Sequence, residues 1–310
     1  MAKRLQNIVA ESRLSLPVAS GYAALVWLAA GLLSHHWWLQ AGCYALSTYL
    51  MVTLNNSYAL LRIYSRMVSC SFIILACMAN FLFDSVDGAI VQTTFIGSYL
   101  TLFHCYQDKQ CVGWIYCSLL LIGIGSLFTP QLLFFVPFIW LLTALQFNAL
   151  SWRSWAASLL GLLTPYWFVG GWLVMRNDMT PLASHLHRLT DFGTIADISS
   201  LPTTHLLVLA VTTILLATGV IHYLRNNYQD KIRTRQYYGF LIIMALQSFV
   251  LLALQPQYYN WLIRLLIINT APIIAHFIAL TKTKVTNIAC CVIAGVCLLV
   301  TAYTLWATTC

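Results

Sequence analysis

Residues 112–175 decide the fold. They read VGWIYCSLLLIGIGSLFTPQLLFFVPFIWLLTALQFNALSWRSWAASLLGLLTPYWFVGGWLVM and contain a single charged side chain, Arg153. Each helical residue rises about 1.5 Å, so about 20 apolar residues cross the hydrocarbon core of a bilayer. The stretch is therefore long enough for roughly three crossings. No soluble core needs so much uninterrupted apolar chain, and the stretch predicts a polytopic membrane protein.

The rest of the chain has the same character. Of its 310 residues, 60% are hydrophobic and 8% are charged, whereas about a quarter of the residues are charged in a typical soluble domain. The net charge of +8 would favour a nucleic-acid partner in a soluble protein. Here the sorting of basic loops to one side of a membrane explains it better, and we expect no nucleic acid to bind.

We predict an all-α bundle of about eleven transmembrane spans that forms one integral membrane domain over residues 1–310. Residues 1–14 form an interfacial amphipathic segment, and residues 176–203 form an outer loop with a short interfacial helix that starts near Pro181. The expected spans are about 16–34, 38–56, 65–83, 88–106, 112–128, 131–150, 154–175, 204–224, 237–254, 262–281 and 286–308.

The distribution of lysine and arginine tests this span count independently. With the N-terminus in the cytoplasm and loops on alternating sides, thirteen basic residues lie on the cytoplasmic side and three on the outer side, which accounts for all 16. The three outer residues are Arg176, Arg188 and Arg264. Cytoplasmic loops of membrane proteins are enriched in lysine and arginine, so the partition predicts an N-in, C-out orientation.

One group of polar residues on the outer side could carry chemistry. Asp84 and Asp87 flank the turn after the third span, and we predict them as catalytic residues. Carboxylates beside basic side chains at a membrane surface suit a lipid-phosphate substrate, because arginine binds phosphate and a carboxylate acts as a base. The predicted substrate-binding residues are Arg176, His185, His187, Arg188 and Arg264. The alternative is that all of these are solvated loop residues.

Other kinds of site have little support in the sequence. The eight histidines form no His box, and the ten cysteines form no CxxC pair and no zinc spacing, so we expect no metal and no cofactor. Walker, GxGxxG and GxSxG sequences are absent. Every charged side chain can be placed within about one helical turn of an interface, and His276 is the deepest titratable group. The sequence thus predicts no buried carboxylate of the kind that ion-coupled transporters use.

Three further features lead to structural expectations. The cysteines in or beside apolar runs should act as small packing residues; they are Cys43, Cys70, Cys77, Cys105, Cys117, Cys290, Cys291 and Cys297. The basic loop from Asn226 should only set the topology and touch anionic lipid. Small residues allow helices to approach closely, and we assign this role to Gly123, Gly125, Gly161, Gly170 and Gly171.

The chain resembles an uncharacterised family of multi-spanning inner-membrane proteins of Bacteroidota. The resemblance covers most of the chain and rests on TLFHCYQ from Thr101, SLFTPQ from Ser126, SLLGLLTPYW from Ser158 and the paired asparagines and arginines of residues 55–66. It implies a location in the bacterial cytoplasmic (inner) membrane.

A second resemblance covers about 45 residues, from Gly123 to Pro165. In order, this stretch contains GxGSLFTP, an apolar span, WRSW, a span rich in small residues and TP. It is similar to the middle of GT-C glycosyltransferases. This resemblance implies a polyprenyl-phosphate-linked substrate at the outer face and an acidic catalytic residue in the first large outer loop. Residues 34–39 of this chain, SHHWWL, contain no carboxylate, so Asp84 or Asp87 would have to take that role.

Three classes of function follow from these observations. The chain could be a GT-C-like protein that handles lipid-linked envelope precursors at the outer face. It could instead be a non-catalytic scaffold or subunit of an envelope complex, with other membrane proteins as its partners. A transporter or flippase is the third class. Membrane lipids are expected partners in all three.

Overall fold

The computed structural model describes residues 5–193, 201–281 and 283–309, and this part of the chain is helical and contains no strand. Lys3, Arg4 and Lys282 of the predicted charge partition, and residues 194–200 of the predicted outer loop, lie outside the described residues. The prediction of an all-α fold is confirmed.

The first half of the chain contains α1 to α7 and two 3-10 helices. Their bounds are α1 Leu5–Glu11, α2 Ser15–Ala29, α3 Trp38–Tyr58, α4 Met67–Met78, η1 Asn80–Leu82, α5 Val86–His104, α6 Val112–Phe128, η2 Pro130–Phe135 and α7 Val136–Leu145. The second half contains α8 Trp152–Met175, α9 Thr180–His187, η3 Arg188–Thr190, α10 Thr203–Asn226, η5 Asn227–Gln229, α11 Ile232–Leu254, η6 Pro256–Tyr258, α12 Tyr259–Leu280 and α13 Lys284–Thr309.

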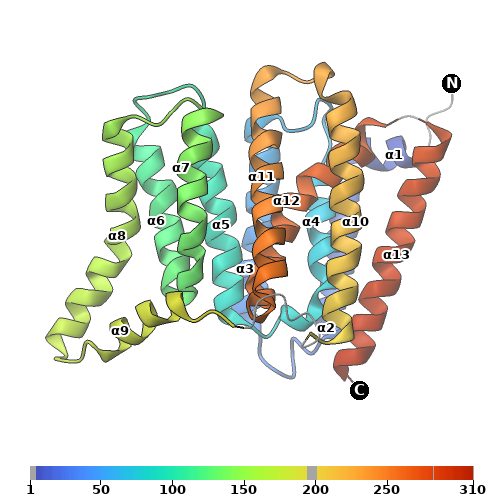
Figure 1. The fold of residues 1–310 in the computed structure, drawn as a ribbon. Coiled ribbons are helices and arrows are strands. Elements are labelled where there is room, and N and C mark those ends of the chain that lie inside the picture. The colour runs from blue at the N-terminus through green and yellow to red at the C-terminus, as the bar shows by residue number, and fades with distance from the viewer. Residues whose placement is uncertain (1–4, 194–200, 282, 310) are drawn as a thin grey trace.

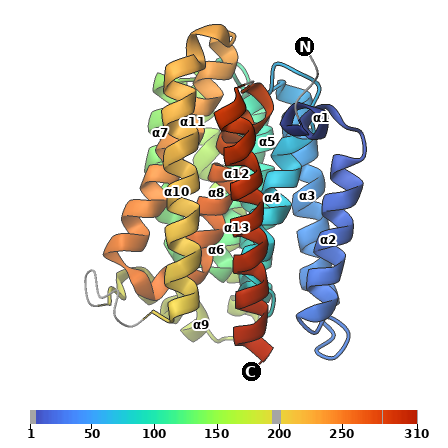
Figure 2. The same ribbon diagram turned by 90° about the vertical axis from the view of Figure 1, so that its right-hand side faces the viewer.

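Successive long helices run in opposite directions between two ends of the bundle (Figure 1). One end carries the turn at Asp84 together with α9 and the start of α12, and we name it the Asp84 end. The other end carries α1, the α5–α6 loop and the α10–α11 loop with Asp230, and we name it the Asp230 end (Figure 1). Viewed from the side, α13 lies on the outside of the bundle and α2 forms an edge (Figure 2).

Five helical segments are long and apolar enough to cross a membrane, which indicates a membrane protein. They are Trp152–Met175, Thr203–Gln229, Ile232–Leu254, Pro256–Leu280 and Lys284–Thr308. The segment that contains α12 is 94% buried within the bundle, whereas the segments of α8 and α13 are each 22% buried. α12 is thus the central helix, and it packs against α4, α5, α10 and α11.

Glycines set the close packing of α6 against α8. A Cβ atom added to Gly161 would lie 2.4 Å from the carbonyl oxygen of Tyr116, and one added to Gly123 would lie 2.7 Å from that of Leu162. These two glycines have the predicted role, since no larger residue fits between the backbones. Gly125 has it too, because its Cβ would lie 2.8 Å from Oγ1 of Thr94.

The same prediction is wrong for Gly170 and Gly171. A Cβ atom at either position would meet no atom within 4 Å. Both glycines follow Gly161 on α8, but Gly170 lies nine residues further on, which is about two and a half helical turns. It therefore points away from the face that Gly161 presents to α6.

Candidate functional site

The two predicted catalytic carboxylates are exposed on the turn that leads into α5. The Oγ atom of Ser85 accepts a hydrogen bond from the backbone N–H of Gly88 at 3.0 Å and so caps this helix. Asp87 lies in the first turn, where the positive end of the helix dipole favours a negative charge. The backbone carbonyl of Asp84 accepts a hydrogen bond from Nε2 of Gln40 at 3.1 Å. The turn is thus held by α3 while both carboxylates face outward.

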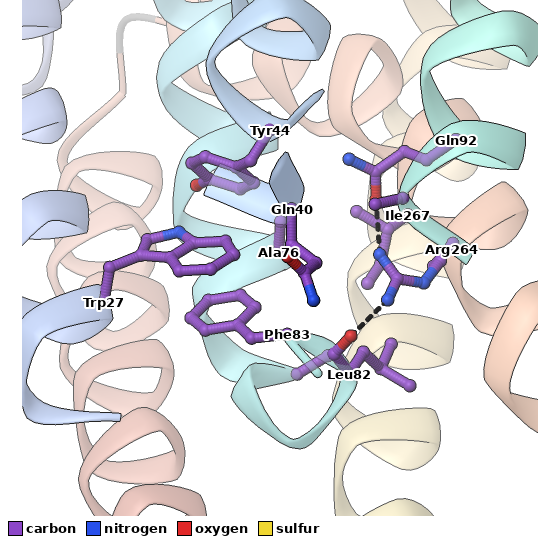
Figure 3. A pocket seen from close by; sticks show the side chains of 11 residues that line it. Trp27, Gln40, Tyr44, Ala76, Leu82, Phe83, Gln92, Arg264 and Ile267 are labelled. Carbon is purple, nitrogen blue, oxygen red and sulfur yellow. Dashed lines mark hydrogen bonds between the residues drawn. The ribbon is translucent and has the colours of Figure 1, made fainter. Parts of the chain in front are cut away.

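Arg264 lies beneath this turn, and only 6% of its surface is exposed (Figure 3). Its guanidinium donates hydrogen bonds to the carbonyl oxygen of Leu82 and to Oε1 of Gln92, the latter at 3.3 Å. Gly88 leaves room for it, since a Cβ atom there would lie 2.6 Å from Nε of Arg264. Asp84 lies on the same turn, but among the described residues no ion pair joins its carboxylate to the guanidinium. The structure therefore places one predicted catalytic residue and one predicted phosphate ligand at the same turn without a direct bond between them.

The polar pocket beside Arg264 is small. Trp27 and Phe83 close one side of it and stack with their ring centroids 3.8 Å apart, and Gln40 and Gln92 contribute amide groups (Figure 3). The remaining cavity has a volume of about 20 Å³, which is room for about one water molecule. A sugar phosphate does not fit this space. Arg264 fastens the α4–α5 turn to α12 and is not open to a large ligand.

A second group of predicted residues lies on α9 and against α8. His185 is buried, with Nε2 3.5 Å from the hydroxyl of Tyr166 and Nδ1 3.2 Å from a guanidinium nitrogen of Arg188. Burial, followed by the nearby Arg188 charge, lowers the pKa of His185 below its usual value. The guanidinium of Arg176 lies over the ring of Trp172 at 3.9 Å, and His187 is exposed.

The two groups do not form one constellation. Arg264 bonds to elements around α12, whereas His185 and Arg188 bond to residues of α8 and to each other. No hydrogen bond or ion pair among the described residues joins the two groups. The single outer constellation predicted from the sequence is therefore divided between two places at the Asp84 end.

An apolar groove lies between η2 and α7 on one side and α11 and α12 on the other. Its volume is about 570 Å³, within the range of about 300–1,000 Å³ that is usual for ligand pockets. Almost all of its lining atoms are apolar; the lining residues are Phe134, Phe138, Phe192, Ile243, Leu246, Gln247, Val250, Leu251, Gln255, Tyr258, Trp261 and Leu262. No local sequence motif predicts this groove, because its apolar lining residues come from several elements that are far apart in the chain.

Residues 188–193 cross the groove at the Asp84 end, and we name them the strap. The carbonyl oxygen of Asp191 accepts hydrogen bonds from the hydroxyl of Tyr258 and from Nε2 of Gln257. The N–H of Gly193 donates to Oε1 of Gln255 at 3.0 Å, and Phe192 stacks on Phe134 across the groove with ring centroids 6.0 Å apart. On the other side Nε2 of Gln131 donates to the carbonyl oxygen of Arg188 at 2.9 Å. The strap thus links the two walls of the groove at this end, and the side chain of its first residue, Arg188, bonds to His185 on α9.

The Asp230 end holds a buried carboxylate, which corrects the expectation that the chain has none. The side chain of Asp230 has no exposed surface; its two oxygens lie 2.9 Å from Nε of Arg62 and 3.0 Å from Nε2 of His276. His276 is itself fully buried, and the ring of His222 lies 5.5 Å from it. The loop from Asn226 therefore does more than set topology, because its carboxylate joins the α3–α4 turn to α12.

Comparisons with known proteins find no family model that matches this chain, no similar curated protein and no similar solved structure.

Proposed function

We propose that the chain is a multi-pass protein of the bacterial cytoplasmic membrane, crosses the bilayer eleven times and binds a lipid with an anionic headgroup at its outer face. The observation that carries lipid binding is the apolar groove that ends at a strap bearing Arg188. The resemblance to inner-membrane proteins of Bacteroidota supports the location.

Two observations support eleven crossings with the N-terminus inside. The five long apolar segments account for five crossings. Six shorter helical segments run between the same two ends and account for the other six; they are α2, α3, α4, α5, α6 and the η2–α7 pair (Figure 1). The thirteen-to-three partition of basic residues fits the same count. A reporter fused after Cys310 is expected on the outer side, and a cytosolic reporter would contradict the odd number of crossings.

The groove suits the hydrocarbon part of a lipid. Transfer of each methylene from water to apolar surroundings contributes about 0.8 kcal/mol to binding. A lipid that enters the groove from the bilayer does not gain this energy, because its chain is already in apolar surroundings. A lipid chain therefore stays in the groove through close packing and through its headgroup. Phe134, Phe192 and Trp261 provide wide apolar faces for such packing.

Basic side chains lie at the same end of the bundle as the strap. Arg188 on the strap and Arg176 at the end of α8 are both exposed, and arginine pairs with phosphate through two parallel hydrogen bonds. His185 holds Arg188 in place through Nδ1 at 3.2 Å. On the strap Arg188 and Asp191 carry one charge each. The Arg188 guanidinium can pair with a headgroup phosphate, and the pairing favours an anionic headgroup because a zwitterionic one also brings a cation to the same site.

The test measures lipid that stays on the purified protein. Delipidated protein in detergent is mixed with phosphatidylglycerol or phosphatidylcholine, and retained lipid is counted by native mass spectrometry. We expect retention of phosphatidylglycerol over phosphatidylcholine. Val250→Trp fills the groove and should abolish retention, whereas Val292→Trp, at a similarly exposed position on α13, should not.

A second pair of variants tests the headgroup. Arg188→Gln should remove the preference for phosphatidylglycerol, and Arg153→Gln, which changes an exposed arginine at the Asp230 end, should leave it intact. Equal retention by Val250→Trp and Val292→Trp would show that the groove is not the binding site, and the proposal would be wrong.

Transfer of a group from such a lipid is a second candidate function. The observation that favours it is the exposed carboxylate of Asp84, which lies on the turn that Arg264 fastens to α12 and can meet a substrate from outside the small pocket. The donor would then be a polyprenyl-phosphate sugar, as the GT-C resemblance implies. The oxygen of an acceptor hydroxyl would bond to the sugar carbon, Asp84 would take the proton of that hydroxyl, and polyprenyl phosphate would leave. Release of polyprenyl phosphate from this donor is the assay. Asp84→Asn should abolish release and Asp87→Asn should not; release by both variants would show that Asp84 is not the base, and no release by the wild type would leave binding without transfer.

A further inference from the structure

Two cysteines close the loop between α5 and α6 at the Asp230 end. Cys105 directly follows α5 and Cys111 directly precedes α6. The Sγ atom of each lies 3.9 Å from the backbone carbonyl oxygen of the other, so the two thiols lie side by side, and Sγ of Cys111 also lies 2.8 Å from the carbonyl oxygen of Asp108. Both side chains are buried, with Cys105 fully covered and Cys111 5% exposed. From the sequence Cys105 is expected to be a packing residue, and no role is expected for Cys111.

The backbone around the pair is fixed. Gln107 has a φ of +59°, and its N–H donates to the carbonyl oxygen of Phe147 at 2.8 Å. The Oδ1 atom of Asp108 accepts from the N–H of Gln110 at 2.8 Å, which closes the turn between the two cysteines. Residues 107–110 are exposed, so solvent reaches this loop. The turn thus holds two thiols side by side beneath an accessible surface.

The two thiols differ chemically. Cys111 is the N-cap residue of a 17-residue helix, and the positive end of a helix stabilises a thiolate. The hydrogen bond from Cys105, which outweighs burial and the Asp108 charge, lowers the pKa of Cys111. The same hydrogen bond, together with burial, raises the pKa of Cys105. The place of Cys111 at the start of α6 thus favours it as the nucleophile of the pair, with Cys105 as the resolving thiol.

We propose that Cys105 and Cys111 form a redox-active dithiol that reacts with low-molecular-weight disulfides and closes into an intramolecular disulfide. The Cys111 thiolate attacks one sulfur of the small disulfide, forms a mixed disulfide and releases one small thiolate. Cys105 then loses its proton and attacks the Cys111 sulfur, which releases the second small thiolate. Both thiolates take up protons, so the dithiol loses two electrons and two protons, and the small disulfide is reduced to two thiols.

The experiment uses the full-length protein in detergent, first reduced and then exposed to mixtures of reduced and oxidised glutathione. Thiols that remain free are alkylated under denaturing conditions, the protein is digested, and the masses of the peptides are measured by mass spectrometry. We expect Cys105 and Cys111 to lose reactivity together, with a peptide mass that shows an internal disulfide. Free thiols at both positions in excess oxidised glutathione would overturn the proposal.

Single variants separate the two roles. Cys105→Ser should trap glutathione on Cys111, because the thiol that would resolve the mixed disulfide is missing. Cys111→Ser should leave Cys105 without glutathione, and Cys290→Ser on α13 should leave the internal disulfide unchanged. The opposite result would be glutathione bound to Cys105 in the Cys111→Ser variant and no glutathione on Cys111 in the Cys105→Ser variant. It would make Cys105 the nucleophile and contradict the proposed step. The wild-type measurement decides whether the disulfide forms even if a variant does not fold.

Discussion

Replacement of Asp230 by asparagine should destabilise the protein, because the carboxylate is the shared partner of two basic side chains. Breaking a fully buried ion pair costs about 3–5 kcal/mol. Here 32% of the Arg62 side chain is exposed, so its charge can turn to solvent. The loss then approaches that of hydrogen bonds to a charged group, about 1.5–3 kcal/mol each. We expect a loss of about 2–3 kcal/mol in total for Asp230→Asn.

The assay is thermal unfolding in detergent, followed by tryptophan fluorescence. A loss of this size should lower the midpoint by about 5 °C, given roughly 2 °C for each kcal/mol in a chain of this length. Asp108→Asn is the control, since it makes the same chemical change on an exposed loop at the same end, where surface substitutions stay within about 0.5 kcal/mol. If Asp230→Asn lowers the midpoint no more than Asp108→Asn does, the buried ion pair does not stabilise the fold.

Three further predictions concern other parts of the bundle. Gly161→Ala should destabilise the protein by about 1–3 kcal/mol through overpacking against Tyr116, whereas Gly171→Ala, with no atom near its new Cβ, should be neutral or stabilising; thermal unfolding of both variants checks this. Arg264→Lys should lower stability by about 2 kcal/mol, because an ammonium does not reproduce the two hydrogen bonds to Leu82 and Gln92, while lipid retention should stay at the wild-type level. Acid should destabilise α9. The pKa of His185 in the folded protein lies below its unfolded value of 6.5, so the unfolded form binds more protons and stability falls as the pH drops below about 6.5. Limited proteolysis of the wild type and of His185→Gln at pH 5.5 and pH 7.5 will test this.

The helices could be predicted from the sequence because the apolar runs determine them. In apolar surroundings the backbone must satisfy its own hydrogen bonds, and a helix does so within one segment. The expected span at 112–128 coincides with α6, and the expected start at 154 lies two residues from the start of α8 at Trp152. Ser151 and Ser154 mark that start because they form a capping box.

The sites could be predicted only in part, since they depend on which helices become neighbours. Asp230 looked like a solvated loop charge because Lys231, Arg233 and Arg235 follow it in the sequence. Its burial comes from the α3–α4 turn and α12, which are distant in sequence. Arg264 and Asp84 lie at the same end of the bundle, as expected, because every second turn of an antiparallel bundle comes to the same end. That α9 would face α8 instead of this pair was not encoded in any local pattern.

The position of α12 determines which wall of the groove can move when a lipid enters. Arg264 and His276 lie twelve residues apart on this helix, about 18 Å along its axis, and each is bonded to a different end of the bundle. α12 is thus fixed at both ends. The opposite wall is joined across the groove by the strap and by the bond from Nε2 of Gln247 to the carbonyl oxygen of Phe134, at 3.0 Å. A lipid chain that widens the groove must stretch that bond and the strap before it shifts α12. Binding should therefore displace η2 and α7 and stretch the bond from Gln131 to the strap, because the other hydrogen bonds of the strap hold it to residues 255–258.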